Sequence, residues 1–199
     1  MNKVLVYVIL YFSFSVSSLI FANQSSNDIT VKQLQGFPEA PAGYSWKVFR
    51  GVAIPKPDAW FEFEDQGVYT TSLESVQKNG IFETGATIQV VRNIQVKHKA
   101  PASVVAIGVI KNYDEQKENK TLLLKHQEVG SFKTFTFRYR NAPNSAKPII
   151  VHKFIMANDK DSFLNIITFE APEEKWDKYW NNQGITIFKR ILSVTYTEN

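Results

Sequence analysis

The sequence predicts an α+β fold, in which an antiparallel sheet of about six or seven strands is covered by helices. Runs with alternating apolar residues, separated by short turn sequences, dominate residues 44–171. Within that stretch, residues 102–113 instead repeat their apolar positions at helical spacing, and a second helical pattern follows Pro172. Strands joined by short turns pair antiparallel, so these strands are expected to form a single sheet. The two helices are then expected to cover that sheet. Residues 44–199 are therefore predicted to form one globular domain.

The first half of the chain contains three predicted strands, at residues 44–54, 67–74 and 86–96. The first reads YSWKVFRGVAI and is predicted to end at Pro55 and Pro57, because proline has no N–H to give to a sheet.

Residues 102–114 are predicted to form a helix that buries one broad face. Ala102, Ala106 and Val109 recur at helical spacing, and Pro101 suits a first helical turn. Gly108 and several β-branched residues favour a strand instead. The pattern runs for about fifteen residues, which is longer than a usual strand, and this length favours the helix.

Two hairpins are predicted after this helix. Gly130 and Ser131 form a two-residue turn within residues 121–140, and the residues NDKD form the turn within residues 147–171. Both strands of the second hairpin are apolar on both faces, so they are predicted to be central and covered by helices.

The last predicted element is a helix that begins at Pro172, where two glutamates suit the positive end of the helix dipole. Gly184 is expected to kink or break it. The residues predicted to lie on or beside its apolar stripe are Trp176, Tyr179, Trp180, Ile187, Phe188 and Ile191.

The N-terminus has the pattern of a secretory signal peptide over residues 1–22. Lys3 precedes an apolar run at residues 4–20, and cleavage is expected after Ala22. The protein is then periplasmic or secreted. The alternative is an uncleaved membrane anchor, but the run lies at the lower length limit of a membrane span and is interrupted by serines. Residues 23–43 are predicted to form a polar, turn-rich lead segment.

Composition excludes several kinds of chemistry. The chain has no cysteine, which excludes disulfides, thiolate metal sites, cysteine nucleophiles and the lipid-bearing cysteine of bacterial lipoproteins. The net charge of +4 comes from interspersed residues, so no basic stripe for nucleic acid is predicted. Contact with a membrane is expected only through the signal segment or as weak attraction to an anionic surface.

Four stretches of the chain resemble the PsbP-like fold, an α/β/α sandwich. They are GVAIPKPDAW, ETGATIQVV, GSFKTFTFRY and APEEKWDKYW. Thylakoid-lumen photosystem II proteins, a Ran-binding nuclear protein and exported bacterial proteins of unknown function share this fold. The resemblance covers residues 44–197 and is one of pattern, so no functional residue is carried over. It implies a non-enzymatic binding or assembly role, with an envelope or secreted protein as partner.

His126 and His152 are the two candidate metal ligands. Each lies in a predicted strand beside a lysine, and if the two hairpins pair, the histidines are able to meet on one face of the sheet. Histidines on the surface or in the core are much more common than such a site. His98 has no second histidine at a metal-binding spacing.

Glu62, Glu64 and Asp65 are candidates for a cation site or an acid/base pair. A strand instead places the two glutamates on one face and Phe61 and Phe63 on the other. That pattern predicts an edge strand with its aromatic side inward, and Trp60 is expected to close one end of the core.

These observations predict an exported, non-catalytic binding or assembly protein without a cofactor. The sequence contains no nucleophile elbow and no glycine-rich phosphate loop. The alternatives are an exported small-ligand or metal-binding protein, a hydrolase with less support, and a weak binder of anionic surfaces.

Overall fold

The computed structural model describes residues 37–74, 82–143 and 147–194. The predicted signal peptide and most of the lead segment lie outside the described residues. A compact unit begins at Pro38. Its elements are β1 (Tyr44–Phe49), β2 (Val52–Pro57), β3 (Phe61–Asp65), β4 (Val68–Ser72), β5 (Gly85–Arg92), α2 (Ile94–His98), α3 (Ala102–Asp114), β6 (Asn119–Val129), β7 (Phe132–Asn141), β8 (Ile149–Asn158), β9 (Phe163–Pro172), η2 (Glu173–Lys175), α4 (Trp176–Tyr179), η3 (Trp180–Gly184), α5 (Ile185–Phe188) and β10 (Leu192–Ser193).

Seven strands form one antiparallel sheet in the order β3-β4-β5-β9-β8-β7-β6. Both predicted hairpins are confirmed, and Val129 pairs with Phe132 across the turn at Gly130 and Ser131. The β8–β9 hairpin lies inside the sheet with mostly buried side chains, also as predicted. The α+β class is confirmed.

A second, three-stranded sheet was not predicted. Residues 44–54 form the β1–β2 hairpin and not one strand, and β10 adds to β2. The turn places Arg50 and Gly51 at positive φ, 47° and 89°. Arginine rarely adopts that conformation, so the sequence did not indicate a turn. Pro55 and Pro57 lie inside β2. They are tolerated because β10 pairs only with Val52 and Ala53, which leaves the rest of β2 with a strand on one side.

The third predicted strand is shorter than expected. β5 ends at Arg92, and the short helix α2 begins at Ile94 after Asn93, which has a φ of 57°. The helix at residues 102–114 is confirmed as α3.

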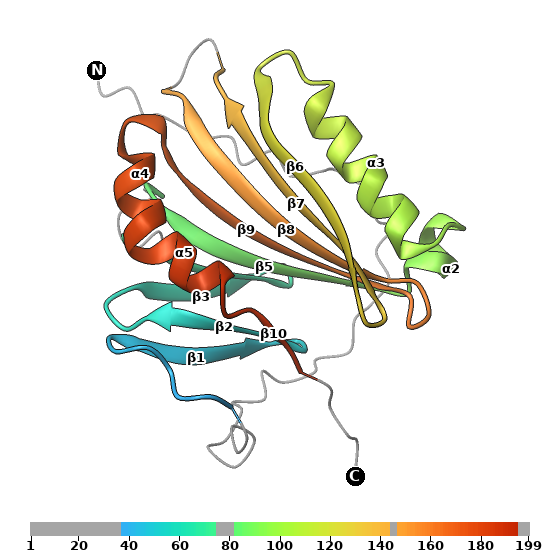
Figure 1. Ribbon diagram of the computed structural model, residues 1–199, viewed down its shortest axis with the longest axis horizontal. Coiled ribbons are helices and arrows are strands. Elements are labelled where there is room, and N and C mark those ends of the chain that lie inside the picture. Colours follow the sequence, from blue (N-terminus) through green and yellow to red (C-terminus); the bar gives the residue numbers. More distant parts are fainter. Residues whose placement is uncertain (1–36, 75–81, 144–146, 195–199) are drawn as a thin grey trace. The chain divides into compact units, whose positions relative to one another are not determined.

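The two faces of the large sheet carry two separate cores. One core packs the α4–α5 segment and the small sheet against the large sheet, with Ile54, Trp60, Phe169, Trp176 and Ile187 among its buried residues. The other packs α3 against Phe135, Phe137 and Tyr139. In Figure 1, α3 and the α4–α5 segment lie on either side of the seven strands.

The C-terminal helical segment is irregular at the predicted position. Residues Trp180–Gly184 form a π-helical turn. The indole of Trp180 lies directly against Gly184, where a Cβ would clash with it. Glycine therefore lets the aromatic ring pack on the helix backbone.

Candidate binding groove

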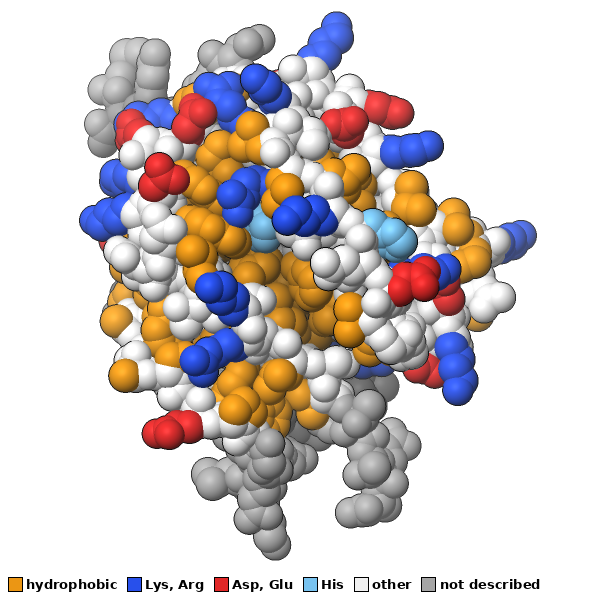
Figure 2. Space-filling model, in the orientation of Figure 1, with side chains coloured by type: hydrophobic (Ala, Val, Ile, Leu, Met, Phe, Trp, Pro, Cys, Tyr) orange, Lys and Arg blue, Asp and Glu red, His pale blue; other side chains and the backbone are white. Residues whose placement is uncertain are grey.

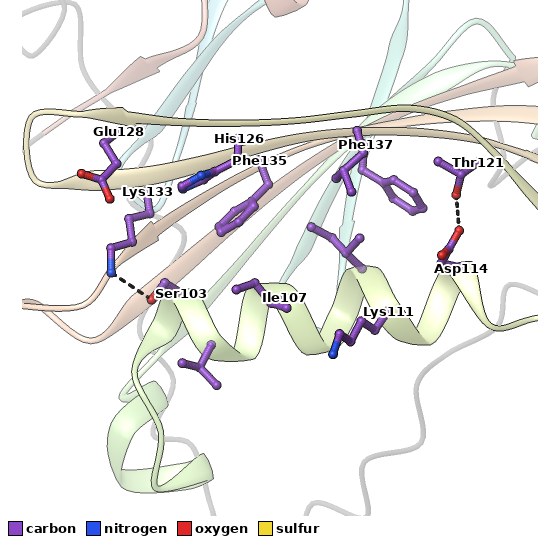
Figure 3. A pocket seen from close by; sticks show the side chains of 13 residues that line it. Ser103, Ile107, Lys111, Asp114, Thr121, His126, Glu128, Lys133, Phe135 and Phe137 are labelled. Atoms are coloured by element: carbon purple, nitrogen blue, oxygen red, sulfur yellow. Dashed lines mark hydrogen bonds between the residues drawn. The ribbon is translucent and has the colours of Figure 1, made fainter.

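An open groove of about 640 Å³ lies between α3, β6 and β7 (Figure 3). We call it the α3–β6 groove. Its lining residues are Ser103, Val104, Ile107, Ile110, Lys111 and Asp114 from α3, Thr121, Leu124, His126 and Glu128 from β6, and Lys133, Phe135 and Phe137 from β7. Its volume is in the range of sites that take small ligands or the side chains of a partner.

Apolar side chains form the floor and both walls of the groove. Phe135 and Phe137 are buried beneath it, because they face α3 in the alternation of β7. Ile107 on α3 is 43% exposed and Leu124 on β6 is 55% exposed. Val104 lies one helical turn from Ile107 and is also exposed. Apolar groups left in solvent on facing walls are typical of an interaction site.

β6 is an edge strand, because it is last in the sheet order and pairs only with β7. It is eleven residues long, and none of its residues is buried. A bulge at Leu122 interrupts its register with β7. One side of its backbone has no strand partner among the described residues, and such an edge is able to pair with another extended chain.

A hydrogen-bonded cluster closes one end of the groove. The carboxylate of Asp159 accepts the backbone N–H of Ser103 at 2.7 Å and the Ser103 hydroxyl at 2.8 Å. Lys133 Nζ lies 3.0 Å from the same carboxylate. Burial opposes ionisation of Asp159, but the bonds from Ser103 and Lys133 together hold its pKa below the usual value. The cluster caps the N-terminus of α3.

At the other end of the groove, the Thr121 hydroxyl donates a hydrogen bond to Asp114 (Figure 3). This bond ties the end of α3 to β6. Lys111, one helical turn earlier, is exposed beside it. The groove is therefore polar at its two ends and apolar between them.

The structure does not bring His126 and His152 together. His126 lines the groove, and its ring stacks on Phe135 at a centroid distance of 4.9 Å. His152 is on the opposite face of the sheet, where its ring packs against Trp180 and Phe188. The ring centroids are 4.5 and 4.8 Å apart, respectively. The two hairpins do pair, through β7 and β8, but the register puts His126 and His152 on opposite faces of the sheet.

His152 is paired with an arginine. Arg138 Nε donates to His152 Nδ1 at 3.1 Å, and the guanidinium lies over Trp180 and Trp176, 4.4 and 4.9 Å from the ring centroids. Burial, and then the charge of Arg138, lower the pKa of His152 to about 3. His152 is thus a neutral acceptor in the core at neutral pH.

The expected orientation of the DAWFEFED strand was wrong. Glu62 accepts a hydrogen bond from the Tyr69 hydroxyl at 2.7 Å, and Glu64 lies 3.3 Å from Arg50. The glutamates therefore face the small sheet, while Phe61 points outward and is 47% exposed. Trp60 is buried in the core, as predicted.

Residues 37–74, 82–143 and 147–194 contain no group of three or more His, Asp or Glu side chains able to hold a metal ion. Within the same residues, the helices are too short or too polar to cross a membrane.

Among the groove residues, His126 was a candidate metal ligand, and the groove itself was not predicted as a site. Two signals were present in the sequence: the run Leu122-Leu123-Leu124, and Val104 and Ile107, which lie off the buried stripe of α3. Each leaves apolar side chains on both sides of its element. Nothing local indicates that these two surfaces face each other.

No protein-family model matches the chain, and no curated protein matches it. The solved structures that are similar in fold include the following three. Cyanobacterial PsbP from Synechocystis superposes with a TM-score of 0.50 at 11% identity, over 77% of this chain and 94% of that one. LpqN, described as involved in cell envelope biogenesis of Mycobacterium tuberculosis, superposes with a TM-score of 0.51 at 10% identity, over 76% of this chain and 92% of that one. The Saccharomyces cerevisiae Ran-binding protein Mog1p superposes with a TM-score of 0.49 at 7% identity, over 76% of this chain and 96% of that one.

At 10 and 11% identity, the likenesses to PsbP and LpqN concern the backbone arrangement and not particular side chains. They cover most of both chains in each case. The chain therefore has the PsbP-like fold that the sequence resemblance predicted.

Proposed function

We propose that the protein is an exported, non-catalytic binding module that holds an extended segment of an envelope or secreted protein in the α3–β6 groove. The observation that carries the proposal is the exposed apolar wall of Ile107 and Leu124 beside an edge strand. A groove between a helix and a free strand edge suits one recurring mode of peptide recognition. In that mode the edge supplies main-chain hydrogen bonds, and the groove receives alternate side chains.

The cluster at the end of the groove supports a binding role over catalysis. Ser103 and Lys133 have the residue types of a nucleophile and its base, with Nζ 3.5 Å from Oγ. Both groups are already engaged by Asp159, and the Ser103 side chain is buried beneath the helix start. This arrangement fits a helix cap. The hydrolase and metal-binding alternatives have lost their main support, because His126 and His152 lie on opposite faces.

An envelope partner is proposed on two grounds. The first is the signal-peptide pattern of residues 1–22. The second is the similarity in fold to LpqN, a protein described as involved in cell envelope biogenesis. The partner is a protein segment in this proposal because main-chain groups of β6 are available for pairing.

The test is affinity purification of the tagged protein from its own cells after mild crosslinking. Ile107→Asp places a charge on the groove wall at a half-exposed position, so the fold should tolerate it. Val96→Asp is the matched control, since Val96 is 80% exposed on α2 and does not line the groove. We expect the wild type and Val96→Asp to retain the same stoichiometric partner and Ile107→Asp to lose it. Equal recovery by all three proteins would refute the groove as the binding site.

A further inference from the structure

The two faces of the β6–β7 hairpin differ in charge. The register pairs Lys120 with Arg140, Leu123 with Arg138 and Lys125 with Thr136. Arg138 pairs in turn with His152, which contacts the α4–α5 segment. This face of the hairpin, opposite the groove, therefore carries four cations: Lys120, Lys125, Arg138 and Arg140. We call it the cationic face.

β6 and β7 are described in full, and neither places a carboxylate on the cationic face. The acidic residue of this hairpin, Glu128, pairs with Lys133 on the groove face. Arg140 bonds to Glu173 at 2.7 Å. The other three cations have no carboxylate within 4 Å among the described residues. Figure 2 shows the same tendency more widely: Lys and Arg stand over the apolar middle of that view, while acidic groups lie toward its margins.

Arg138 is the most constrained of these cations. Its guanidinium is half-buried over two tryptophan rings, and its Nε is held by His152. Burial disfavours the charge of Arg138, and Asp177 favours it without forming an ion pair. An incoming carboxylate would stabilise the half-buried cation further. A planar guanidinium fixed in this way is also suited to carboxylate recognition.

We infer that the segment bound at β6 is an extended strand in which apolar and acidic residues alternate. This inference rests on the proposed function and adds the chemistry of the partner. A strand that pairs with the β6 edge points successive side chains to opposite faces of the sheet. Its apolar side chains then enter the groove beside Ile107 and Leu124, and its acidic side chains lie over the cationic face beside Lys125.

The length of the segment follows from β6. The bulge at Leu122 ends the regular register, so continuous pairing is available along residues 123–129. Lys125 lies in this regular stretch, and Lys120 lies on the same face just beyond the bulge. A segment of about seven residues therefore matches the edge, and a paired strand would lie about 4.8 Å from β6.

The test uses two fluorescent synthetic peptides, an alternating Val/Glu octamer and an alternating Val/Lys octamer, with binding measured by anisotropy. We expect the wild type to prefer the Val/Glu peptide. The variant Lys120→Glu/Lys125→Glu should bind that peptide about tenfold or more weakly, and should prefer the Val/Lys peptide. The control Lys189→Glu/Arg190→Glu makes the same charge change at exposed positions after α5 and should behave as the wild type.

The outcomes separate the inference from the proposed function. If both peptides bind equally and charge reversal changes nothing, the inference about acidic residues is wrong. If Ile107→Asp still weakens both peptides in that case, the groove stands. If neither peptide binds the wild type, the inference is overturned, and the purification with Ile107→Asp decides the groove separately.

Discussion

His152 should make the stability of the protein depend on pH between about 3 and 7. Its side chain is 5% exposed and sits against Trp180 and Phe188. A proton on Nδ1 would break the bond from Arg138 and place two cations 3.1 Å apart. The folded protein therefore excludes this proton, whereas the unfolded chain takes it up.

The magnitude follows from the two pKa values of His152. Burial and the charge of Arg138 lower the folded value from 6.5 to about 3. Below pH 6.5 the unfolded state binds the proton and the folded state does not, so the free energy of unfolding falls by about 1.4 kcal/mol per pH unit. Acidification from pH 8 to pH 5 should thus remove about 2 kcal/mol.

Urea unfolding, followed by tryptophan fluorescence at several pH values, measures this loss. His152→Gln keeps an acceptor for Arg138 without a titrating ring, so the variant should lack the His152 contribution. Burial raises the pKa of Glu170 against the opposing charge of Lys153, and that group acts with the opposite sign. The quantity to compare is therefore the difference between the wild type and His152→Gln.

The control is His126→Gln, which changes an exposed histidine and should keep the wild-type pH dependence. A difference between the wild type and His152→Gln that stays constant from pH 8 to pH 5 would refute the reasoning. It would mean that His152 takes up its proton equally in the folded and unfolded states.

Three further predictions concern the fold and export. Gly85→Ala should destabilise the protein by about 1–3 kcal/mol in urea unfolding, because the new Cβ would clash with the Thr71 carbonyl. Its control is Gly108→Ala on α3, where the new Cβ meets nothing within 4 Å. That variant should be more stable than the wild type by up to about 1 kcal/mol. Asp159→Asn should lower the free energy of unfolding by about 1 kcal/mol, because it weakens the α3 cap. Since the pKa of Asp159 is lowered in the fold, the advantage of the wild type over this variant should shrink as the pH falls below about 4. An unchanged unfolding midpoint would contradict the capping role. Mass spectrometry of the exported protein should find its N-terminus directly after Ala22, and an intact Met1 in the membrane fraction would favour the anchor alternative.

The hairpins and α3 were predictable because their signals are local. Alternation along β7 places Phe135, Phe137 and Tyr139 on one face whatever their partners are, and Gly130 marks the turn. The small sheet was not predictable, because its turn uses an arginine at positive φ and its third strand is only two residues long.

The site depends on pairings between distant residues, which local patterns do not specify. Whether His126 and His152 share a face is decided by the register across β6, β7 and β8, and one residue of shift reverses the answer. The exposed glutamates of β3 lie on the face toward the small sheet, where they pair with Lys47 and Arg50, and the sequence did not indicate that this sheet exists. The groove requires α3 to lie beside β6, and this position follows from the packing of α3 on β7 and β8.

The most direct test of the central claim is site-specific photocrosslinking in living cells. A photoreactive amino acid is placed singly at Ile107 or Leu124 in the groove, at Val96 on α2, or at Phe61 on the opposite edge strand. All four positions are apolar and at least 43% exposed, so exposure alone does not distinguish them. We predict one common protein adduct from Ile107 and Leu124 and none from Val96 or Phe61. The same adduct from Phe61 or Val96, with none from the groove positions, would contradict the account.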